Sequence, residues 1–162
     1  MSRKLLSIAL AALSLWTLAA GAQDRDEPRE LGELFCKLTQ GGEQFAPKYL
    51  LTASLVAEID AGLKKNDEWA AAHPGDKPPL GDGIHFASFP DGAPVCRVDP
   101  IAAEGTMHVD IQYIVGASPE ANWTDRLVLK SEGGLPRIDD VLYGTAKYDL
   151  GLRDALTAAF QN

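Results

Sequence analysis

The strongest constraint on the fold is the alternation of apolar and polar residues in the second half of the chain. Between residues 106 and 115 every second side chain is apolar, which is typical of a β-strand with one buried face. The apolar row is Met107, Val109, Ile111, Tyr113 and Val115, and the opposite row is His108, Asp110, Gln112 and Ile114. Such a strand belongs to an antiparallel sheet whose apolar face needs a covering layer.

Four other segments are predicted as strands. Residues 84–89 and 95–98 flank the turn Pro90-Asp91-Gly92, and residues 123–130 and 135–143 flank the loop Ser131-Glu132-Gly133-Gly134. The second pair predicts a hairpin, and a four-residue loop would place Arg126 opposite Asp139. The side chains expected on the apolar side of this hairpin are Trp123, Leu127, Leu129, Ile138 and Leu142.

A first helix is predicted over residues 26–38, ahead of the strands. Asp26 or Glu27 can cap it, Pro28 is tolerated in its first turn, and Gly41-Gly42 ends it. Its apolar stripe is Leu31, Leu34, Phe35 and Leu38, which places Cys36 off the stripe and facing away from the main contact.

A second helix is predicted to begin at the N-cap residue Thr52 and to stop at His73-Pro74-Gly75. It either continues or restarts through residues 66–72, with Trp69 as an anchor. Its buried stripe is Leu55, Val56, Ile59 and Leu63. Residues 74–83 contain three prolines and three glycines and are expected to form an irregular surface loop.

A last helix is predicted over residues 149–160. Tyr148, Leu152, Leu156 and Phe160 recur at a spacing of four and would attach it to the rest of the domain. Helices, then an antiparallel meander, then one terminal helix indicate an α+β fold with N-terminal helices packed on the sheet.

The first 22 residues have the pattern of a secretory signal peptide. Arg3 and Lys4 precede a charge-free apolar run, and Ala20-Gly21-Ala22 fits a signal-peptidase site. Cleavage after Ala22 would leave one α+β domain over residues 23–162, in the periplasm or secreted. We expect no stable membrane insertion after cleavage, because no later segment is apolar enough.

The chain is acidic, with a net charge of −8, and loss of the two basic residues of the signal brings it to −10. Such a domain has no electrostatic reason to bind nucleic acid or anionic lipid. Its charge fits a soluble protein or one with a basic protein partner.

Cys36 and Cys96 are the only cysteines. In an oxidising compartment two cysteines usually form a disulfide. Two buried thiols or a metal site are the alternatives, although no histidine stands at ligand spacing from either cysteine.

Two segments resemble parts of nuclear-transport-factor-2-like domains. Tyr49-Leu50-Leu51-Thr52-x-x-Leu55 resembles the Tyr-Leu-(Ser/Thr)-x-x-Leu opening before their long helix. Leu135-Pro136-Arg137-Ile138-Asp139-Asp140-Val141-x-Tyr143 resembles their closing Trp-(Lys/Arg)-Ile-Asp-Asp-(Val/Ile) strand, with Pro136 in place of the usual Trp. Proline is tolerated there only at an edge or a strand start.

With the signal peptide and the terminal Leu152-Arg153-Asp154-Ala155-Leu156, the chain most resembles the exported domain-of-unknown-function 3828 family. The resemblance implies a curved sheet wrapped around helices, often with a conical pocket, and it implies no reaction, because function resides in the site.

No residue cluster reaches the standard of a catalytic motif, and no cofactor or metal is expected. An isomerase-type site needs a carboxylate base and oxyanion donors in an apolar pocket, and the candidates are Tyr113, Tyr143, Asp110 and Asp139. Alternation turns Asp110 away from the apolar face, and an ion pair of Asp139 with Arg126 or Arg137 is the better expectation.

Two functional hypotheses follow. The first is a non-catalytic periplasmic binding or interaction module with a protein partner, of immunity type or as an envelope accessory. The alternative is a small isomerase- or dehydratase-type enzyme that uses a carboxylate in a conical cavity. The candidate pocket or binding residues are Tyr49, Trp69, Tyr113, Asp139 and Tyr143.

Overall fold

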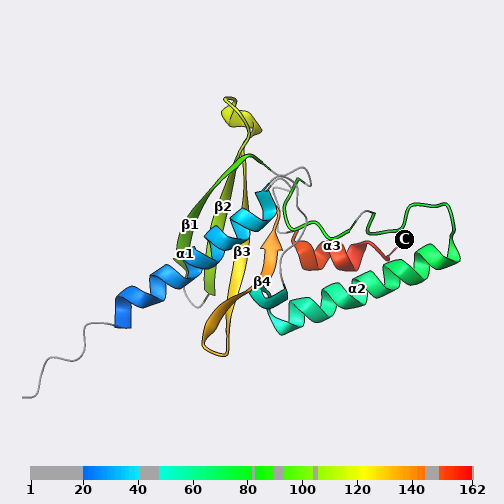
Figure 1. Cartoon of the computed structure of the whole chain (residues 1–162), viewed down its shortest axis with the longest axis horizontal. Coiled ribbons are helices and arrows are strands. Elements are labelled where there is room, and N and C mark those ends of the chain that lie inside the picture. Colours follow the sequence, from blue (N-terminus) through cyan, green and yellow to red (C-terminus); the bar gives the residue numbers. More distant parts are fainter. Residues whose placement is uncertain are drawn as a thin grey trace, which may run out of the picture.

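The computed structural model describes residues 20–40, 48–81, 83–89, 93–103, 106–144 and 150–161. The elements are α1 (Ala20–Thr39), η2 (Lys48–Leu50), α2 (Ala53–Ala72), β1 (Val95–Ala103), β2 (Thr106–Ile114), η3 (Pro119–Ala121), β3 (Trp123–Glu132), β4 (Leu135–Leu142) and α3 (Leu152–Ala158). Two helices, a four-stranded antiparallel sheet and a short terminal helix confirm the predicted α+β class. In Figure 1, α1 lies across the sheet, and α2 and α3 extend together from the β4 side.

The sheet is an antiparallel meander in the order β1-β2-β3-β4. The alternation predicted for β2 is confirmed over Val109, Ile111 and Tyr113, which are fully buried, whereas Gln112 is exposed. Val115, predicted in the same buried row, follows the end of the strand and is exposed. The three buried side chains of β2 and Leu127 of β3 form the centre of the hydrophobic core.

A two-residue turn, Gly133-Gly134, joins β3 and β4, so the predicted four-residue loop is wrong. Both glycines have positive φ, 62° and 83°, which suits the twist of a tight hairpin. The shorter turn pairs Arg126 with Leu142, not with Asp139. The Arg126 guanidinium instead binds Asp110 of β2, with Nε 2.6 Å from Oδ1.

A β-bulge in β4 changes which of its side chains are buried. Val128 pairs with Asp140 and Leu129 pairs with Ile138, so Asp139 is the additional residue. The inserted residue reverses the alternation beyond it, since the side-chain period in a strand is two. Val141 is therefore fully buried, and the prediction that Leu142 lies on the buried face is wrong.

Helix α1 packs on β1 and β2. The face of the helix that is buried is rotated about the helix axis by about one residue from the predicted stripe. Its buried residues are Pro28, Leu31, Gly32, Phe35, Cys36 and Thr39. Leu34 is 38% exposed, and Cys36 faces the sheet, so both predictions were wrong. Pro28 lies inside the helix and not in its first turn.

Gly32 explains how closely α1 approaches the sheet. A Cβ built at Gly32 would lie 2.6 Å from Cγ1 of Val109 and 2.8 Å from Cγ1 of Val98. A larger residue would force the helix or these two valine side chains to shift, so glycine allows this close contact on the side of α1 that also carries Cys36.

Helix α2 begins as predicted, since the Thr52 hydroxyl accepts a hydrogen bond from the Leu55 amide at 3.2 Å. It runs without interruption to Ala72. Leu63 is exposed, contrary to the predicted stripe, and Gly62 is buried in its place, near Leu156 of α3 and Leu80. In α3, Leu152 and Leu156 are buried as expected, but the helix starts at Leu152, and Tyr148 and Asp149 lie outside the described residues.

Residues 83–89 form bends, so the strand predicted over residues 84–89 is wrong. Ile84 and Phe86 are buried, and this burial accounts for the apparent alternation. The backbone of this segment is bound by a side chain and not by strand pairing: the Ser88 amide donates a hydrogen bond to the Asp125 carboxylate at 2.8 Å.

Three further sequence predictions fall largely or wholly outside the described residues. Of the predicted signal peptide, residues 1–22, only positions 20–22 are described. The helix stop Gly41-Gly42 and the turn Pro90-Asp91-Gly92 are not described. Within the described part of the chain, no helix has the length and apolar character needed to cross a membrane.

Candidate functional site

A cavity of about 280 Å³ lies between α3 and the segment that follows α2. Its walls are Pro79, Leu80, Gly81, Gly83, Ile84, His85, Tyr143, Leu152, Ala155, Leu156 and Ala159. The volume is close to the lower end of the roughly 300–1,000 Å³ found for small-molecule sites. The segment expected to be a plain surface loop therefore forms one wall of the best candidate site.

Two features hold that wall in place. The Asn66 side chain of α2 accepts a hydrogen bond from the Leu80 amide at 2.9 Å. Turn hydrogen bonds from Gly81 to Pro78 and from Gly83 to Leu80 close the loop on itself. The cavity is thus bounded by backbone that has its own hydrogen-bond partners.

Tyr143 closes the end of the cavity next to the sheet. Its hydroxyl donates a hydrogen bond to the backbone oxygen of His85 at 2.5 Å. Burial, together with the negative charges of Asp125 and Asp140, raises the pKa of Tyr143 above its ordinary value. Tyr143 therefore stays protonated and acts as a hydrogen-bond donor that positions His85.

His85 is the second ionisable side chain on the cavity wall. Its Nδ1 atom is buried and has no hydrogen-bond partner among the described residues. A buried polar atom without a partner is unfavourable by about 1–3 kcal/mol, and this nitrogen has almost no exposed surface, so it is shielded from the cavity.

Asp125 was not singled out from the sequence, although it organises the surroundings of the cavity. It is fully buried and accepts hydrogen bonds from the Ser88 amide and hydroxyl, from the Trp123 indole at 3.3 Å and from the Gly144 amide at 3.0 Å. The alternation Trp123, Asp125, Leu127 could have revealed it, because it places a carboxylate on the apolar face of β3.

Asp139 lies at the edge of the sheet and not in the cavity. It accepts hydrogen bonds from Thr52 at 2.9 Å and from Arg153 at 2.9 Å, and Lys130 lies 2.6 Å from Oδ2. Burial alone would raise the pKa of Asp139, but hydrogen bonds from Lys130 and Thr52 and the charge of Arg153 outweigh it and lower the pKa. The expected partners Arg126 and Arg137 are replaced by Lys130 and Arg153.

The other candidate residues are dispersed. Tyr49 is 63% exposed, and Trp69 stacks on His73 at the end of α2. Tyr113 is fully buried against Trp123, and its hydroxyl lies near Thr39 without a well-formed hydrogen bond. Burial raises the pKa of Tyr113 to about 12, even though Thr39 acts in the opposite direction. Of the five candidates, Tyr143 alone lines the cavity.

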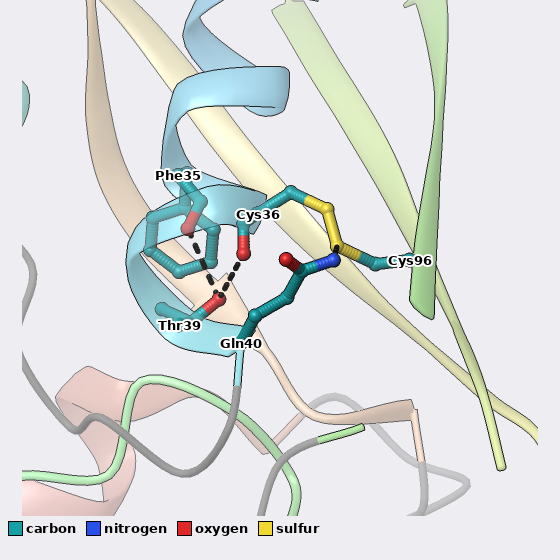
Figure 2. Close-up of a disulfide and its surroundings, with 5 residues drawn as sticks. All are labelled: Phe35, Cys36, Thr39, Gln40 and Cys96. Carbon is teal, nitrogen blue, oxygen red and sulfur yellow. Dashed lines mark hydrogen bonds between the residues drawn. A yellow bond between two sulfur atoms is a disulfide. The ribbon is translucent and has the colours of Figure 1, made fainter. Parts of the chain in front are cut away.

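The predicted disulfide is confirmed. Figure 2 shows Cys36 of α1 joined to Cys96 of β1, with their Cα atoms 6.3 Å apart. The Gln40 amide lies 3.6 Å from the Cys96 sulfur, and the Thr39 hydroxyl donates to the Phe35 carbonyl oxygen at 3.0 Å. A structural disulfide is typical of an extracytoplasmic protein.

Among the described residues, no group of three or more His, Cys, Asp or Glu side chains could hold a metal ion. The chain matches no known family model, no curated protein and no solved structure.

Proposed function

We propose that this protein is a non-catalytic binding domain of the periplasm or the secreted fraction, and that its site is the cavity beside α3. The observation that carries the proposal is the composition of the cavity wall. Its described residues include no Asp, Glu, Lys or Arg, and their ionisable side chains are His85 and Tyr143. The disulfide and the predicted signal peptide, cleaved after Ala22, support the compartment.

The buried carboxylates contribute to the scaffold instead of to a reaction. A general base must come within hydrogen-bond reach of the proton that it removes. Asp125 and Asp139 are each surrounded by donors from their own protein and lie outside the residues that line the cavity. The isomerase or dehydratase alternative would need such a carboxylate in the cavity, and no described lining residue supplies one.

Membership of the nuclear-transport-factor-2-like superfamily, with a curved, cone-shaped sheet, is part of the proposal. Its support is that the two segments carrying the resemblance meet in space. Leu51 forms a parallel bridge with Ile138, and the Thr52 amide donates to the Ile138 carbonyl oxygen at 2.8 Å. Pro136 lies near the start of β4, at the edge of the sheet, where proline is tolerated.

Native mass spectrometry of the protein recovered from its exported fraction tests this function. We expect a non-covalently bound compound or partner that is released chemically unchanged when the protein is unfolded. Conversion of the released compound on incubation with fresh protein would show catalysis and contradict the proposal. An empty protein in every preparation would also count against it.

A further inference from the structure

The outer edge of β1 is the open edge of the sheet. At the other end of the strand order β4 is covered by short segments, since Leu51 bridges Ile138 and Gly151 bridges Leu142. In the described part of the chain β1 pairs with β2 alone, and Figure 1 shows β1 as the strand furthest from α2 and α3. An edge strand of nine residues presents a row of main-chain donors and acceptors to a further strand.

Pro100 indicates which residues of β1 present these groups outward. Proline has no amide hydrogen, and in an edge strand its nitrogen faces the free edge. Pro100 lies inside the continuous β1–β2 ladder, so its nitrogen faces away from β2. Alternate residues of an antiparallel strand direct both main-chain groups to the same edge. The amide and carbonyl groups of Cys96 and Val98 therefore face outward as well.

The same two residues direct their side chains toward α1. Cys96 forms the disulfide with that helix, and Cγ1 of Val98 lies against Gly32. The odd-numbered positions of β1 belong to the opposite face of the sheet. On that face Val95 is 48% exposed and Arg97 is also exposed. The residues at positions 95, 97, 99 and 101 are Val, Arg, Asp and Ile.

This order of residues is self-complementary when two copies of β1 run antiparallel. With Val98 opposite its counterpart, Arg97 of each copy lies opposite Asp99 of the other. In the same register Val95 lies opposite Ile101. Opposite charges and β-branched pairs in directly opposed positions stabilise a sheet, whereas like charges there destabilise it. A register centred on residue 97 or residue 99 would oppose two arginines or two aspartates, so the charges select the register centred on Val98.

The main chains also match in this register, because residues whose groups face outward lie opposite one another. The Val98 amide of each copy can donate to the Val98 carbonyl oxygen of the other. The Cys96 amide can donate to the Pro100 carbonyl oxygen of the second copy. The amide hydrogen that Pro100 lacks therefore falls beside the centre of the pairing and not at it.

We propose that two copies of this protein associate through their β1 edges, antiparallel and about a two-fold axis at Val98. The joined sheet has eight strands, four from each copy. Arg97 and Asp99 determine the register, and pairing covers the exposed Val95. The proposal goes beyond the binding function, since no described residue of β1 lines the α3 cavity.

Sedimentation equilibrium of the exported, disulfide-bonded protein measures the association. Pairing through one strand buries a small area, so we expect a reversible dimer with a dissociation constant between about 10 µM and about 1 mM. The measurement is made at physiological salt, because both copies are acidic and salt screens their long-range repulsion.

Exchange of the two charges tests the register. Arg97→Asp and Asp99→Arg should each raise the dissociation constant at least about fivefold, because each variant turns both ion pairs of the dimer into like-charge pairs. The double variant Arg97→Asp/Asp99→Arg restores opposite charges and should return the dissociation constant to within about threefold of the wild type. Arg137→Asp, on β4, makes the same change in net charge as Arg97→Asp and should leave the dissociation constant within about twofold.

Amide hydrogen exchange of the wild type gives a second readout that needs no variant. The Cys96 and Val98 amides should exchange more slowly at high than at low protein concentration. The Arg97 amide, which faces β2, should be protected at both. The proposal is overturned if the wild type remains a monomer, if either folded single variant dimerises as tightly as the wild type, or if the folded double variant does not recover. Exchange of Cys96 and Val98 that is independent of concentration would overturn it as well, and none of these results bears on the cavity.

Discussion

The Asp139 carboxylate receives hydrogen bonds from three parts of the chain at the edge of the sheet. Thr52 belongs to the start of α2, Lys130 to β3 and Arg153 to α3. Arg153 also binds Glu58 and the Ser54 hydroxyl of α2. One carboxylate therefore links α2 and α3 to the sheet.

The substitution Asp139→Asn should lower the free energy of unfolding by about 1–3 kcal/mol. It removes the negative charge that Lys130 and Arg153 bind and leaves these two cations without it. Urea denaturation measures the change. Asp67→Asn on the exposed surface of α2 serves as the control and should stay within about 0.5 kcal/mol of the wild type. An unchanged or raised stability for Asp139→Asn would favour a functional role, since such residues are often suboptimal for stability.

The contribution of Asp139 should also depend on pH. Its pKa in the folded protein lies below the ordinary value of 3.8. The ionised form is therefore stabilised by folding, and this stability is present above pH 3.8 and is lost as the pH falls through the folded-state pKa. The difference in unfolding free energy between wild type and Asp139→Asn should be full at pH 7 and shrink on acidification below about pH 4. A difference that grew at low pH would contradict the assignment.

At single residues, local contacts were predictable from the sequence and long-range contacts were not. The cap at Thr52 was predictable because its hydrogen bond to Leu55 is local. The partners of Asp139 were not, because Thr52 and Arg153 approach it only after α2 and α3 have packed. Asp125 was visible in the alternation of β3, but the loop groups that it binds, at Ser88 and Gly144, were not.

At the scale of secondary-structure elements, the β3–β4 hairpin sets the register of the sheet edge. Its two-residue turn requires the left-handed conformation at Gly133 and Gly134. A residue with a Cβ in that conformation is unfavourable by roughly 1–2 kcal/mol, and asparagine is tolerated better than alanine.

Replacement of Gly133 by alanine should therefore destabilise the protein by about 1 kcal/mol, and Gly133→Asn should destabilise it clearly less. Thermal unfolding monitored by circular dichroism compares the two variants. Because a Cβ at Gly133 meets no other atom within 4 Å, the difference between them reports backbone conformation. Equal melting temperatures for both variants would contradict the turn assignment.

The buried face of an element was predicted correctly where the residue pattern of that element is sufficient. It was predicted incorrectly where packing between two elements decides which side chains are buried. The burial pattern of β2 followed from its alternation alone. In β4, strict alternation from Ile138 predicts that Leu142 is buried. The bulge at Asp139 adds one residue, so Val141 is buried instead. In α1 the periodicity gave the helix, but the close contact of Gly32 with Val98 and Val109 decided that Cys36, and not Leu34, faces the sheet.

For the whole molecule, the disulfide is the covalent link between the helical layer and the sheet. It joins residues 60 positions apart and ties the end of α1 to the first strand. In the chain-entropy description, closing a loop of this length stabilises the folded state by about 4 kcal/mol at 25 °C.

The double variant Cys36→Ser/Cys96→Ser should accordingly lose roughly 2–5 kcal/mol of unfolding free energy. Urea denaturation of the exported protein measures the loss, and the wild type treated with a reductant provides a second comparison. Thiol labelling of the untreated wild type should find no reactive cysteine. Two labelled thiols in the folded protein would contradict the bond.

The cavity itself could not be derived from the sequence. Its walls come from residues 79–81 and 83–85, Tyr143 and the α3 region, which are separated along the chain and brought together by packing. Tyr143 was a candidate because a tyrosine can act as an oxyanion donor, whereas His85 belongs to no motif identified in the sequence. The irregular composition of residues 74–83 correctly predicted a loop but carried no information about what the loop would cover.

The most direct test of the central claim is native mass spectrometry of the exported wild type beside Ala159→Phe and Ala158→Phe. Ala159 lines the cavity, whereas Ala158 is exposed and does not. If the α3 cavity is the binding site, the wild type and Ala158→Phe retain the same bound mass, and Ala159→Phe, which fills the cavity, does not. Retention of that mass by a folded Ala159→Phe protein, or its absence from the wild type, would contradict the account.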